Sequence, residues 1–536
     1  MTVLLLVTGL DVPSGPEQAI PGDAIALLEW DDPLASLERF RHSPAGEVLL
    51  DPSLAPTLNT TGMSAEKIRA LEMVRQFCTQ IESTHPLSRY MRKRVVVALL
   101  PAEPGEDNVP MNLVAAMLSP KIVPSKWFIR TLRKRFDGLS TSFQGLHQGA
   151  PIYRIQYGNL VALVSWCRGV ILAGLREHTL HRCIDRILES SVNRPGGPEA
   201  NVQRVQLQEH SEKKEDLLFA ADLEVLPDFP GRTWLEPLLK PGGKIGLYHR
   251  RAGSEDRFTL IHRFPSTREG VFAELPAPTL FYPGPEQLFS NQLVYVQSNL
   301  FSLERLWQAA ASSSNPDIAT AAFFVAMRAE EYTGMSLDEL FRLFGPEIGL
   351  LVDRFMTNGF FPVPRPCLFF GIKNPQEVQR MMATVLHHLP VITTRLDDTV
   401  VYSLQLAGGL MQPSYCIIGS SLVVADNREQ IEDLLSSADK TRLVEDQMYR
   451  RVDVGLSKPS NLLAFVRTAA VNDSLKELAL WIVSVLETDE EQGVGKRIFV
   501  KRLVLPLLDS IKHFKAKGIR GYIKDDSLIM DAALAS

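Results

Sequence analysis

The sequence predicts an α+β fold made by tandem duplication, with two similar units that are each a mainly antiparallel sheet with helices packed on one face. Three observations lead to this prediction. A strand–turn–helix phrase is written twice, further pairs of similar segments follow it in the same order, and within each copy three strands succeed one another without an intervening helix.

The repeated phrase combines a period-2 strand, a turn and a helix. DAIALLEWDDPLASLERF, at residues 23–40, has alternating apolar residues up to Trp30, then a turn, then apolar positions at helical spacing. NQLVYVQSNLFSLERL, at 291–306, has the same order of events. The letters SLER therefore occur at 36–39 and again at 302–305, each time after a strand and a turn.

The further pairs keep their order and their spacing. YRIQYG, from Tyr153, resembles YSLQLA, from Tyr402; GVILAGLRE resembles SLVVADNRE; and DLLFAADLEVL resembles NLLAFVRTAAV. A last pair, GKIGLY and GIRGYI, precedes in each copy a polar corner and a returning strand, which is the pattern of a hairpin. All offsets lie between 245 and 275 positions, so we interpret the pattern as a tandem duplication. Chance recurrence of common strand and helix composition is the alternative.

These repeats divide the chain into a first unit at 23–275 and a second unit at 291–536. Residues 276–290 are expected to be a Pro-rich linker, and FPVPRP at 361–366 a connector, because proline removes a ladder donor and fixes φ. Residues 1–22 are expected to be a leader or the remnant of a truncated membrane anchor. Their first ten letters, MTVLLLVTGL, are apolar but lack the basic region of a signal peptide and the length of a spanning helix.

One helix begins with a clear local signal. Ser336 and Glu339, in SLDEL, fit the capping box, in which each of the two side chains accepts a hydrogen bond from the backbone amide of the other residue. This pattern predicts a helix from Leu337 onward, and it concerns stability rather than function.

The composition excludes several classes of protein. With 45% hydrophobic residues, 22% charged residues and a formal charge of −5, the chain is typical of a folded protein and has no broad positive field for nucleic acid. Its five cysteines are scattered and form no C-x-x-C pair, so we expect buried thiols rather than disulfides. No cofactor is indicated.

Motifs of catalysis and metal binding are incomplete. QGVGK at 492–496 lacks the leading glycine and the Ser or Thr of a phosphate loop, and SEKK at 211–214 lies in a charged run where its lysine would stay protonated. His178, His181 and Cys183 form the most metal-like group, but on a helix Cys183 projects away from the other two, and the second copy has no histidine there. We therefore predict neither a metal site nor a catalytic site.

The densest basic and aromatic segment is the candidate contact surface. It contains Lys126, Trp127, Arg130, Arg133 and Lys134. On a helix the apolar residues of this segment line one face and the basic residues another, which would suit docking on an anionic membrane or an acidic protein. The solvated face of a packed helix is the alternative.

The segments LEWDDPLASLERF, LFRLFGPEIGLLV, YCIIGSSLVVAD and GIRGYIKDDSL together resemble an uncharacterised bacterial family, classed as a domain of unknown function. Members of that family commonly carry an amino-terminal membrane anchor. The resemblance covers nearly the whole chain, implies a place in the cell envelope on the periplasmic side of a membrane, and supplies no catalytic residues. If Met1 is the true start and no anchor exists, a cytoplasmic location is expected instead.

These observations favour a non-enzymatic binding or scaffolding protein of the envelope, with an unknown protein or a lipid surface as its partner. The first alternative is a carrier that holds an apolar ligand such as a lipid between its two units, because Phe and Leu are abundant at strand positions. A second alternative is an enzyme whose site assembles from residues distant in the sequence, which a pocket with convergent titratable groups would favour.

Overall fold

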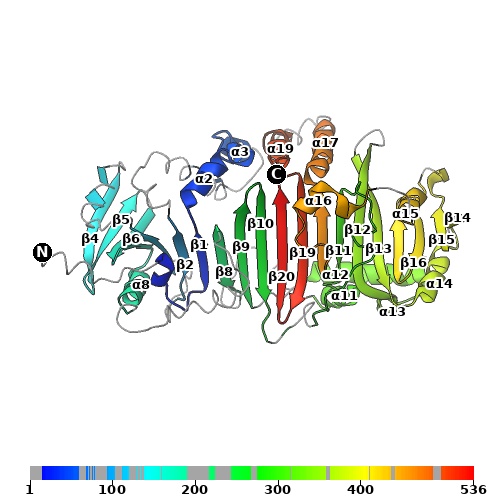
Figure 1. The fold of residues 1–536 in the computed structure, drawn as a ribbon, viewed down its shortest axis with the longest axis horizontal. Helices are drawn as coiled ribbons and strands as arrows, with labels where there is room; N and C mark the ends of the chain where they lie inside the picture. The colour runs from blue at the N-terminus through cyan, green and yellow to red at the C-terminus, as the bar shows by residue number, and fades with distance from the viewer. Residues whose placement is uncertain are drawn as a thin grey trace. The chain divides into compact units, whose positions relative to one another are not determined.

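The computed structural model describes residues 15–59, 93–102, 112–119, 138–157, 160–189, 216–223, 243–266, 274–313, 315–357, 362–396, 398–409, 411–435, 441–486 and 497–536, with the isolated positions 65, 68–69, 72, 75, 78, 129–130, 133–134 and 268. They fall into two compact units. Unit 1 comprises the described residues up to Leu223 and from Gly243 to Arg250, and unit 2 comprises those from Arg251 to Ser536. Figure 1 labels the elements of both.

Unit 1 is built on an antiparallel sheet. Across the sheet the strands are β9 (Lys244–Ala252, which belongs to this unit up to Arg250), β8 (Leu217–Asp222), β1 (Ala26–Trp30), β2 (Val95–Leu99), β3 (Leu113–Leu118), β7 (Val170–Gly174), β6 (Leu160–Cys167), β5 (Ala150–Tyr157) and β4 (Leu139–His147). The central strands β1 and β2 are short and rich in β-branched or long apolar residues, and buried positions alternate along both. Successive side chains of a strand point to opposite faces, so this alternation means that one face of the sheet is more deeply buried than the other.

The helices of unit 1 are η1 (Pro16–Ala19), α2 (Pro33–Arg41), α3 (Pro44–Leu49), α4 (Leu54–Asn59) and α8 (Glu177–Glu189). Helix α8 places Leu180, Cys183, Ile184 and Ile187 on one face, at the i, i+3, i+4, i+7 spacing of an amphipathic helix. These side chains form one core cluster with buried residues of β1, β2, β3, β5 and β7. The position of α8 therefore follows from its apolar stripe.

Unit 2 is also antiparallel and has eleven described strands. Across its sheet they are β10 (Glu255–Arg263), β20 (Ser527–Ala535), β19 (Ala516–Lys524), β18 (Leu462–Val466), β11 (Val294–Ser298), β12 (Phe344–Thr357), β13 (Pro362–Ile372), β17 (Ser421–Ala425), β16 (Ser414–Ile418), β15 (Thr399–Leu404) and β14 (Val391–Leu396). The mixture of this sheet with helices confirms the predicted α+β class. The residues of β10 group with unit 2, whereas the sequence boundaries placed them in the first unit.

The helices of unit 2 are α11 (Leu303–Ala311), α12 (Pro316–Thr333), α13 (Leu337–Leu343), α14 (Pro375–Leu386), η4 (Ala407–Gly409), α15 (Arg428–Leu435), η5 (Leu443–Glu445), α16 (Gln447–Arg451), α17 (Thr468–Leu486), the π-helical turn η6 (Val500–Val504) and α19 (Leu505–Ile511). Ile431 of α15 packs in one cluster with Val423, whereas Val378 of α14 packs in another with Leu422. Successive residues of β17 point to opposite faces, so helices cover both faces of the sheet. The expectation of helices on one face only was wrong for unit 2.

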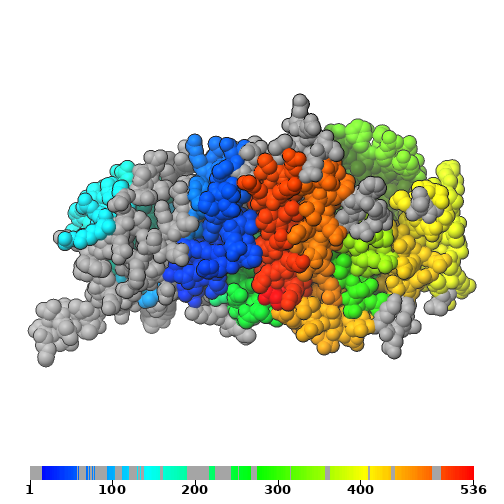
Figure 2. Space-filling view, turned by 90° about the horizontal axis from the view of Figure 1, so that it is seen from above, coloured from blue at the N-terminus to red at the C-terminus, as the bar shows by residue number. Residues whose placement is uncertain are grey.

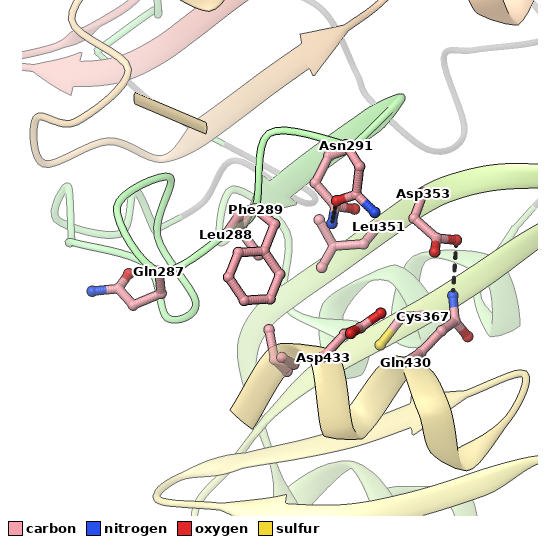
Figure 3. A pocket seen from close by; sticks show the side chains of 11 residues that line it. Gln287, Leu288, Phe289, Asn291, Leu351, Asp353, Cys367, Gln430 and Asp433 are labelled. Carbon is pink, nitrogen blue, oxygen red and sulfur yellow. Dashed lines mark hydrogen bonds between the residues drawn. The ribbon is translucent and has the colours of Figure 1, made fainter. Parts of the chain in front are cut away.

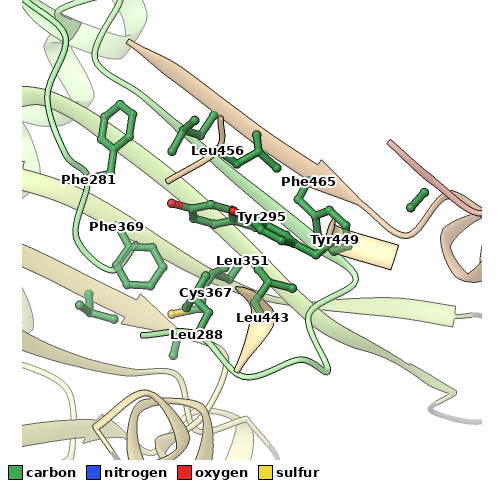
Figure 4. Close-up of a cluster of buried hydrophobic side chains, with 14 of the residues drawn as sticks. Phe281, Leu288, Tyr295, Leu351, Cys367, Phe369, Leu443, Tyr449, Leu456 and Phe465 are labelled. Carbon is green, nitrogen blue, oxygen red and sulfur yellow. The ribbon is translucent and has the colours of Figure 1, made fainter. Parts of the chain in front are cut away.

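The main core of unit 2 is aromatic at its centre (Figure 4). Tyr295 of β11 is 1% exposed, and its hydroxyl donates to Oε1 of Gln297 at 2.9 Å. Tyr449 of α16 packs on Phe465 of β18, with ring centroids 5.4 Å apart. Residues of η5, α15, β12 and β13 close around these rings, so the core joins segments that are far apart in the sequence.

The order of strands is the same in the two units. Counting from β19, the unit 2 sheet runs β19, β18, β11, β12, β13, β17, β16, β15 and β14, and the unit 1 sheet runs β9, β8, β1, β2, β3, β7, β6, β5 and β4. Each strand of one series thus has the neighbours that its counterpart has in the other.

A turn with the sequence GPEQ precedes β1 in unit 1 and its counterpart β11 in unit 2, at 15–18 and at 284–287. In each turn the glutamine amide donates to the glycine carbonyl, at 3.3 Å and 3.0 Å. The two residues after each turn are buried: Ala19 and Ile20 in unit 1, Leu288 and Phe289 in unit 2. Residues 15–20 and 284–289, expected to be parts of a leader and a linker, therefore contribute to the packing of the units, while residues 1–14 lie outside the described residues.

Candidate functional site

A cleft of about 300 Å³ opens at the start of α11 in unit 2. The end of β11, the first turn of α11, the junction of α13 with β12, and the residue after β13 form its walls. The apolar side chains that line it are Leu275, Leu300, Leu303, Phe341 and Phe344. The charged residues that line it are Glu274, Glu304, Arg305 and Lys373. This volume lies at the lower end of the range of small-molecule sites.

Arg305, in the first turn of α11, is one of the two cations that line this cleft. Ser302 caps α11, and its Oγ accepts a hydrogen bond from the Arg305 amide at 3.2 Å, so the Arg305 side chain leaves from the first helical turn. Nη2 of Arg305 forms an ion pair with Glu274, whose side chain is 83% exposed. Nη1 of Arg305 is buried and has no hydrogen-bond partner within the described part of the chain. A buried donor without a partner is costly, so an acceptor that reached Nη1 would stabilise this arginine.

Two buried asparagines hold the segment that forms one wall of the cleft. Asn461 donates to Oδ1 of Asn299 at 2.9 Å and to the carbonyl of Pro276 at 2.9 Å. Asn299 in turn donates to Oγ1 of Thr279 at 3.1 Å. Buried amides are stable only when such bonds are made, so this network fixes the wall against the ends of β11 and β18.

A second pocket, of about 30 Å³, lies among residues 287–292, β12, β13 and α15 (Figure 3). Beside it, Arg365 is 1% exposed and bonds to both oxygens of Asp353 and, at 2.9 Å, to Glu429. Burial opposes the charge of Arg365, but these carboxylates raise its pKa. Gln430 donates to the Arg365 carbonyl at 3.0 Å. It also donates to Asp353, as Figure 3 shows. The pocket holds about one water molecule, so we assign it a structural role.

The three residues of the metal-like group do not converge. Cys183 lies in the core of unit 1, where burial raises the pKa of its thiol to about 12. His181 stacks instead on His147 of β4, with ring centroids 3.8 Å apart, and Nε2 of His147 lies 2.6 Å from Oδ1 of Asp185. His178 contacts its neighbour Thr179. In the part of the chain that the structure describes, no three His, Cys, Asp or Glu side chains could hold a metal ion together.

The candidate basic segment is described in part. Lys126 and Trp127 lie outside the described residues, as do 211–214 and 492–496. Arg130, Arg133 and Lys134 are all exposed. The neighbouring Ile129 is buried against Ile171 of β7, on the face of the unit 1 sheet opposite to α8. An inward Ile129 with outward basic residues fits both interpretations of this segment, a contact surface and the solvated face of a packed helix.

Helix α12 has its small residues inward and its large apolar residues outward. Its contacts are with α11, α13 and α14. The buried and half-buried positions include four alanines with helical spacing, at 319, 322, 326 and 329. The exposed side chains include five large apolar ones: Phe323 at 66%, Phe324 and Val325 at 55%, Met327 at 43% and Tyr332 at 66%. Most surface helices have the reverse arrangement, so this face is a candidate for contact with an apolar partner.

A second apolar surface lies on α17, which packs against α19 in unit 2. Asn472 of α17 donates to the Leu508 carbonyl at 2.6 Å, and Lys476 pairs with Asp509 at 2.7 Å. The exposed apolar residues of α17 are Leu475, Leu480, Ile482 and Val485. Figure 2 looks onto this side of unit 2, with α17 and α19 in orange to red. No described helix combines the length and the apolarity that crossing a bilayer requires.

Comparison with known proteins gives no family. No family model matches the chain, and no curated protein matches it. Among solved structures, crystal form III of TP0453 is similar at 12% identity and a TM-score of 0.27, covering 48% of this chain and 83% of its own. Crystal form I of TP0453 is similar at 13% identity and a TM-score of 0.24, covering 49% of this chain and 83% of its own. Similarity at this level carries no argument, and the resemblance to an uncharacterised bacterial family stays a prediction.

Proposed function

We propose that this chain is a binding protein without a reaction of its own, which docks on a lipid surface through the outward face of α12. The observation that carries the proposal is the exposure of Phe323, Phe324 and Val325 on one helix. Insertion into the interfacial zone of a bilayer would remove this surface from water, at about 25 cal/mol per Å² of apolar area. A place in the cell envelope is part of the same proposal.

The distribution of charge on α12 favours a membrane contact made by apolar insertion over one made by electrostatic attraction. Residues 318–327 contain no charged side chain, and Arg328 is paired with Glu331 at 2.6 Å. Docking through α12 therefore depends on apolar burial, and we expect it to be insensitive to salt and to lipid charge. Contact through the exposed basic residues Arg130 and Arg133 would have the opposite signature, because it requires anionic lipid and weakens with salt.

The test is flotation of the full chain with vesicles of phosphatidylcholine, alone or mixed with phosphatidylglycerol, at low and high salt. We expect binding to both kinds of vesicle. The double variant Phe323→Ser, Phe324→Ser should bind at least about tenfold more weakly, because burying each Phe contributes about 1.5–3 kcal/mol. The control Leu146→Ser, Leu280→Ser removes two side chains that are 67% and 69% exposed elsewhere, and it should change nothing.

Two results would contradict docking through α12. Failure to bind either kind of vesicle would leave the exposed face of α12 as a contact for a protein partner. Binding confined to anionic vesicles, and abolished by Arg130→Glu with Arg133→Glu, would assign the membrane contact to the basic segment instead.

We also propose that the two units arose by tandem duplication. The common order of nine strands supports this, and so does the register: Trp30 lies opposite Leu217 between β1 and β8, and Ser298 lies opposite Leu462 between β11 and β18. The counterparts β7 and β17 also have the same sequence of buried and half-buried positions. An experimental structure in which the two units failed to superpose strand for strand would overturn the duplication.

Carriage of an apolar ligand is a second candidate function, and the cleft at the start of α11 is the observation that favours it. This cleft lies within unit 2. Native mass spectrometry of the purified full chain is the test: a co-purifying fatty acid or lipid supports carriage, and a mass equal to that of the chain alone speaks against it.

A further inference from the structure

We propose that the cleft at the start of α11 binds the carboxylate of a free medium-chain fatty acid, with the acyl chain on its apolar walls. This inference names a ligand for the second candidate function. It rests on residues that α12 does not contribute, so it stands or falls separately from docking on a lipid surface.

The polar end of the site is formed by Arg305 and the first turn of α11. Arg305 lines the cleft with a side chain that is 25% exposed, and its buried Nη1 lacks a hydrogen-bond partner in the described structure. The first amides of a helix have no acceptor inside the helix, and the helix dipole favours negative charge beside them. Lys373 follows β13, and its amide donates to the Leu343 carbonyl at 2.8 Å, which fixes its backbone at the rim. A carboxylate here would receive charge-assisted hydrogen bonds.

The apolar end of the site limits the length of the ligand. Leu300, 7% exposed, belongs to a core cluster, and Phe341 packs near Trp307 with ring centroids 6.3 Å apart, so these walls are held by neighbouring side chains. A volume of about 300 Å³ is at the lower end for ligand sites, which favours a single short acyl chain, such as that of octanoate, over the paired chains of a membrane lipid.

Glu274 is the internal competitor of the ligand. The two carboxylates of the cleft, Glu274 and Glu304, balance Arg305 and Lys373, so an incoming carboxylate has to replace Glu274 at Arg305. The Glu274 side chain is 83% exposed, and its release into water costs little because exposed ion pairs are weak. Removing the Glu274 charge should therefore tighten binding, while removing the Arg305 charge should weaken it.

The experiment is isothermal titration calorimetry of the full chain with octanoate, octanol and acetate. Octanoate should bind more tightly than either of the others, because it alone has both the charge and the chain. Arg305→Gln should weaken octanoate binding by about tenfold to a hundredfold, and Arg305→Lys by less, since lysine keeps the charge without the fork of donors. Glu274→Gln should strengthen it. Arg342→Gln, at an exposed arginine of α13 that does not line the cleft, should leave it unchanged.

The opposite signs of the two effects separate ligand binding from a structural role. If Arg305 and Glu274 only stabilise the fold, both substitutions lower the melting temperature and neither tightens octanoate binding, which would overturn the inference. Equal affinity for octanol and octanoate would overturn it as well. Displacement of octanoate by phosphatidylglycerol vesicles would overturn the choice of a free acid in favour of a lipid headgroup. Octanoate binding that persists in the Phe323→Ser, Phe324→Ser variant leaves this inference intact even if flotation fails.

Discussion

A buried guanidinium fixes the local arrangement of three elements in unit 2. Arg365 lies on β13, Asp353 on the adjacent β12, and Glu429 in the first turn of α15, and Arg365 bonds to both carboxylates. An arginine without these partners would be too costly to bury at 1% exposure. The ion pair therefore specifies where α15 sits on the sheet.

Removing only the negative partner of Arg365 should strongly destabilise unit 2. Asp353→Asn leaves Arg365 buried with only the exposed Glu429 as a counter-charge, so we expect the free energy of unfolding to fall by about 3–5 kcal/mol in urea denaturation. The double variant Asp353→Leu, Arg365→Met removes both charges and should cost clearly less. Glu429→Gln removes the exposed partner and should cost less than Asp353→Asn, because the Glu429 side chain is 62% exposed. A single variant as stable as the double one would contradict this account.

Local polar motifs were readable from the sequence, and long-range ones were not. The capping box is confirmed: Oγ of Ser336 accepts from the Glu339 amide at 3.3 Å, and Oε2 of Glu339 accepts from the Ser336 amide at 2.9 Å. Both partners lie within one turn, so their spacing alone specifies the contact. The role of Arg365 depends on Asp353 and Glu429, which lie 12 and 64 positions away in the sequence. The prediction that FPVPRP is a connector was wrong, because from Pro362 onward this segment is part of β13.

At the scale of elements, the repeated letters SLER locate a repeated helix but not its start. Ser302 is the N-cap of α11, whereas α2 is capped by Asp32 and contains Ser36 in its interior. Relative to the caps, the two copies of SLER are displaced by about one helical turn. The Arg305 of the second copy thereby reaches the cleft, a role that the letters alone did not reveal.

The sequence analysis predicted strands in which apolar and polar residues alternate. It missed strands whose side chains are largely exposed on both faces of the sheet. The three successive strands expected in each copy are present, as β5, β6 and β7 and as β15, β16 and β17. The sequence analysis missed β4 and β14, whose sequences LSTSFQGLH and VITTRL are largely exposed along their length. A strand that buries neither face has no period-2 signal, so its sequence resembles that of a loop.

The alanine stripe of α12 leads to a prediction about this helix. Ala322 is 5% exposed where α12 meets its neighbouring helices, while Ala321 is exposed. Ala322→Leu should therefore overpack the contact and lower the free energy of unfolding by about 1–3 kcal/mol. Ala321→Leu adds the same atoms on the outward side and should have little effect. Equal loss of stability in the two variants, measured by urea denaturation, would show that α12 does not pack through this stripe.

At the scale of the whole molecule, each unit has its own core. The largest cluster of unit 2 runs from Phe281 to Ala535, and the largest cluster of unit 1 runs from Ala19 to Ile187, with no residue in common. The sequence identified two units but not their edges, because residues 276–290 have the composition of a linker although Phe281 and Leu288 are buried. The cleft could not be predicted from the sequence either, because Glu274, Arg305 and Lys373 come from three separate segments that only the folded unit brings together.

Separate cores should respond separately to damage. Phe465→Ala, at a side chain with 0% exposure in unit 2, should lower the stability of that unit by about 3–5 kcal/mol, and Ile184→Ala, also at 0%, that of unit 1 by about 2–5 kcal/mol. Amide hydrogen exchange followed by mass spectrometry should show faster exchange in β11, β12, β18 and α16 for Phe465→Ala, with β2, β3 and β7 unchanged, and the reverse pattern for Ile184→Ala. Each variant serves as the other's control, because both remove a fully buried apolar side chain. Acceleration of exchange throughout the chain by either substitution would mean that the two units unfold as one cooperative body.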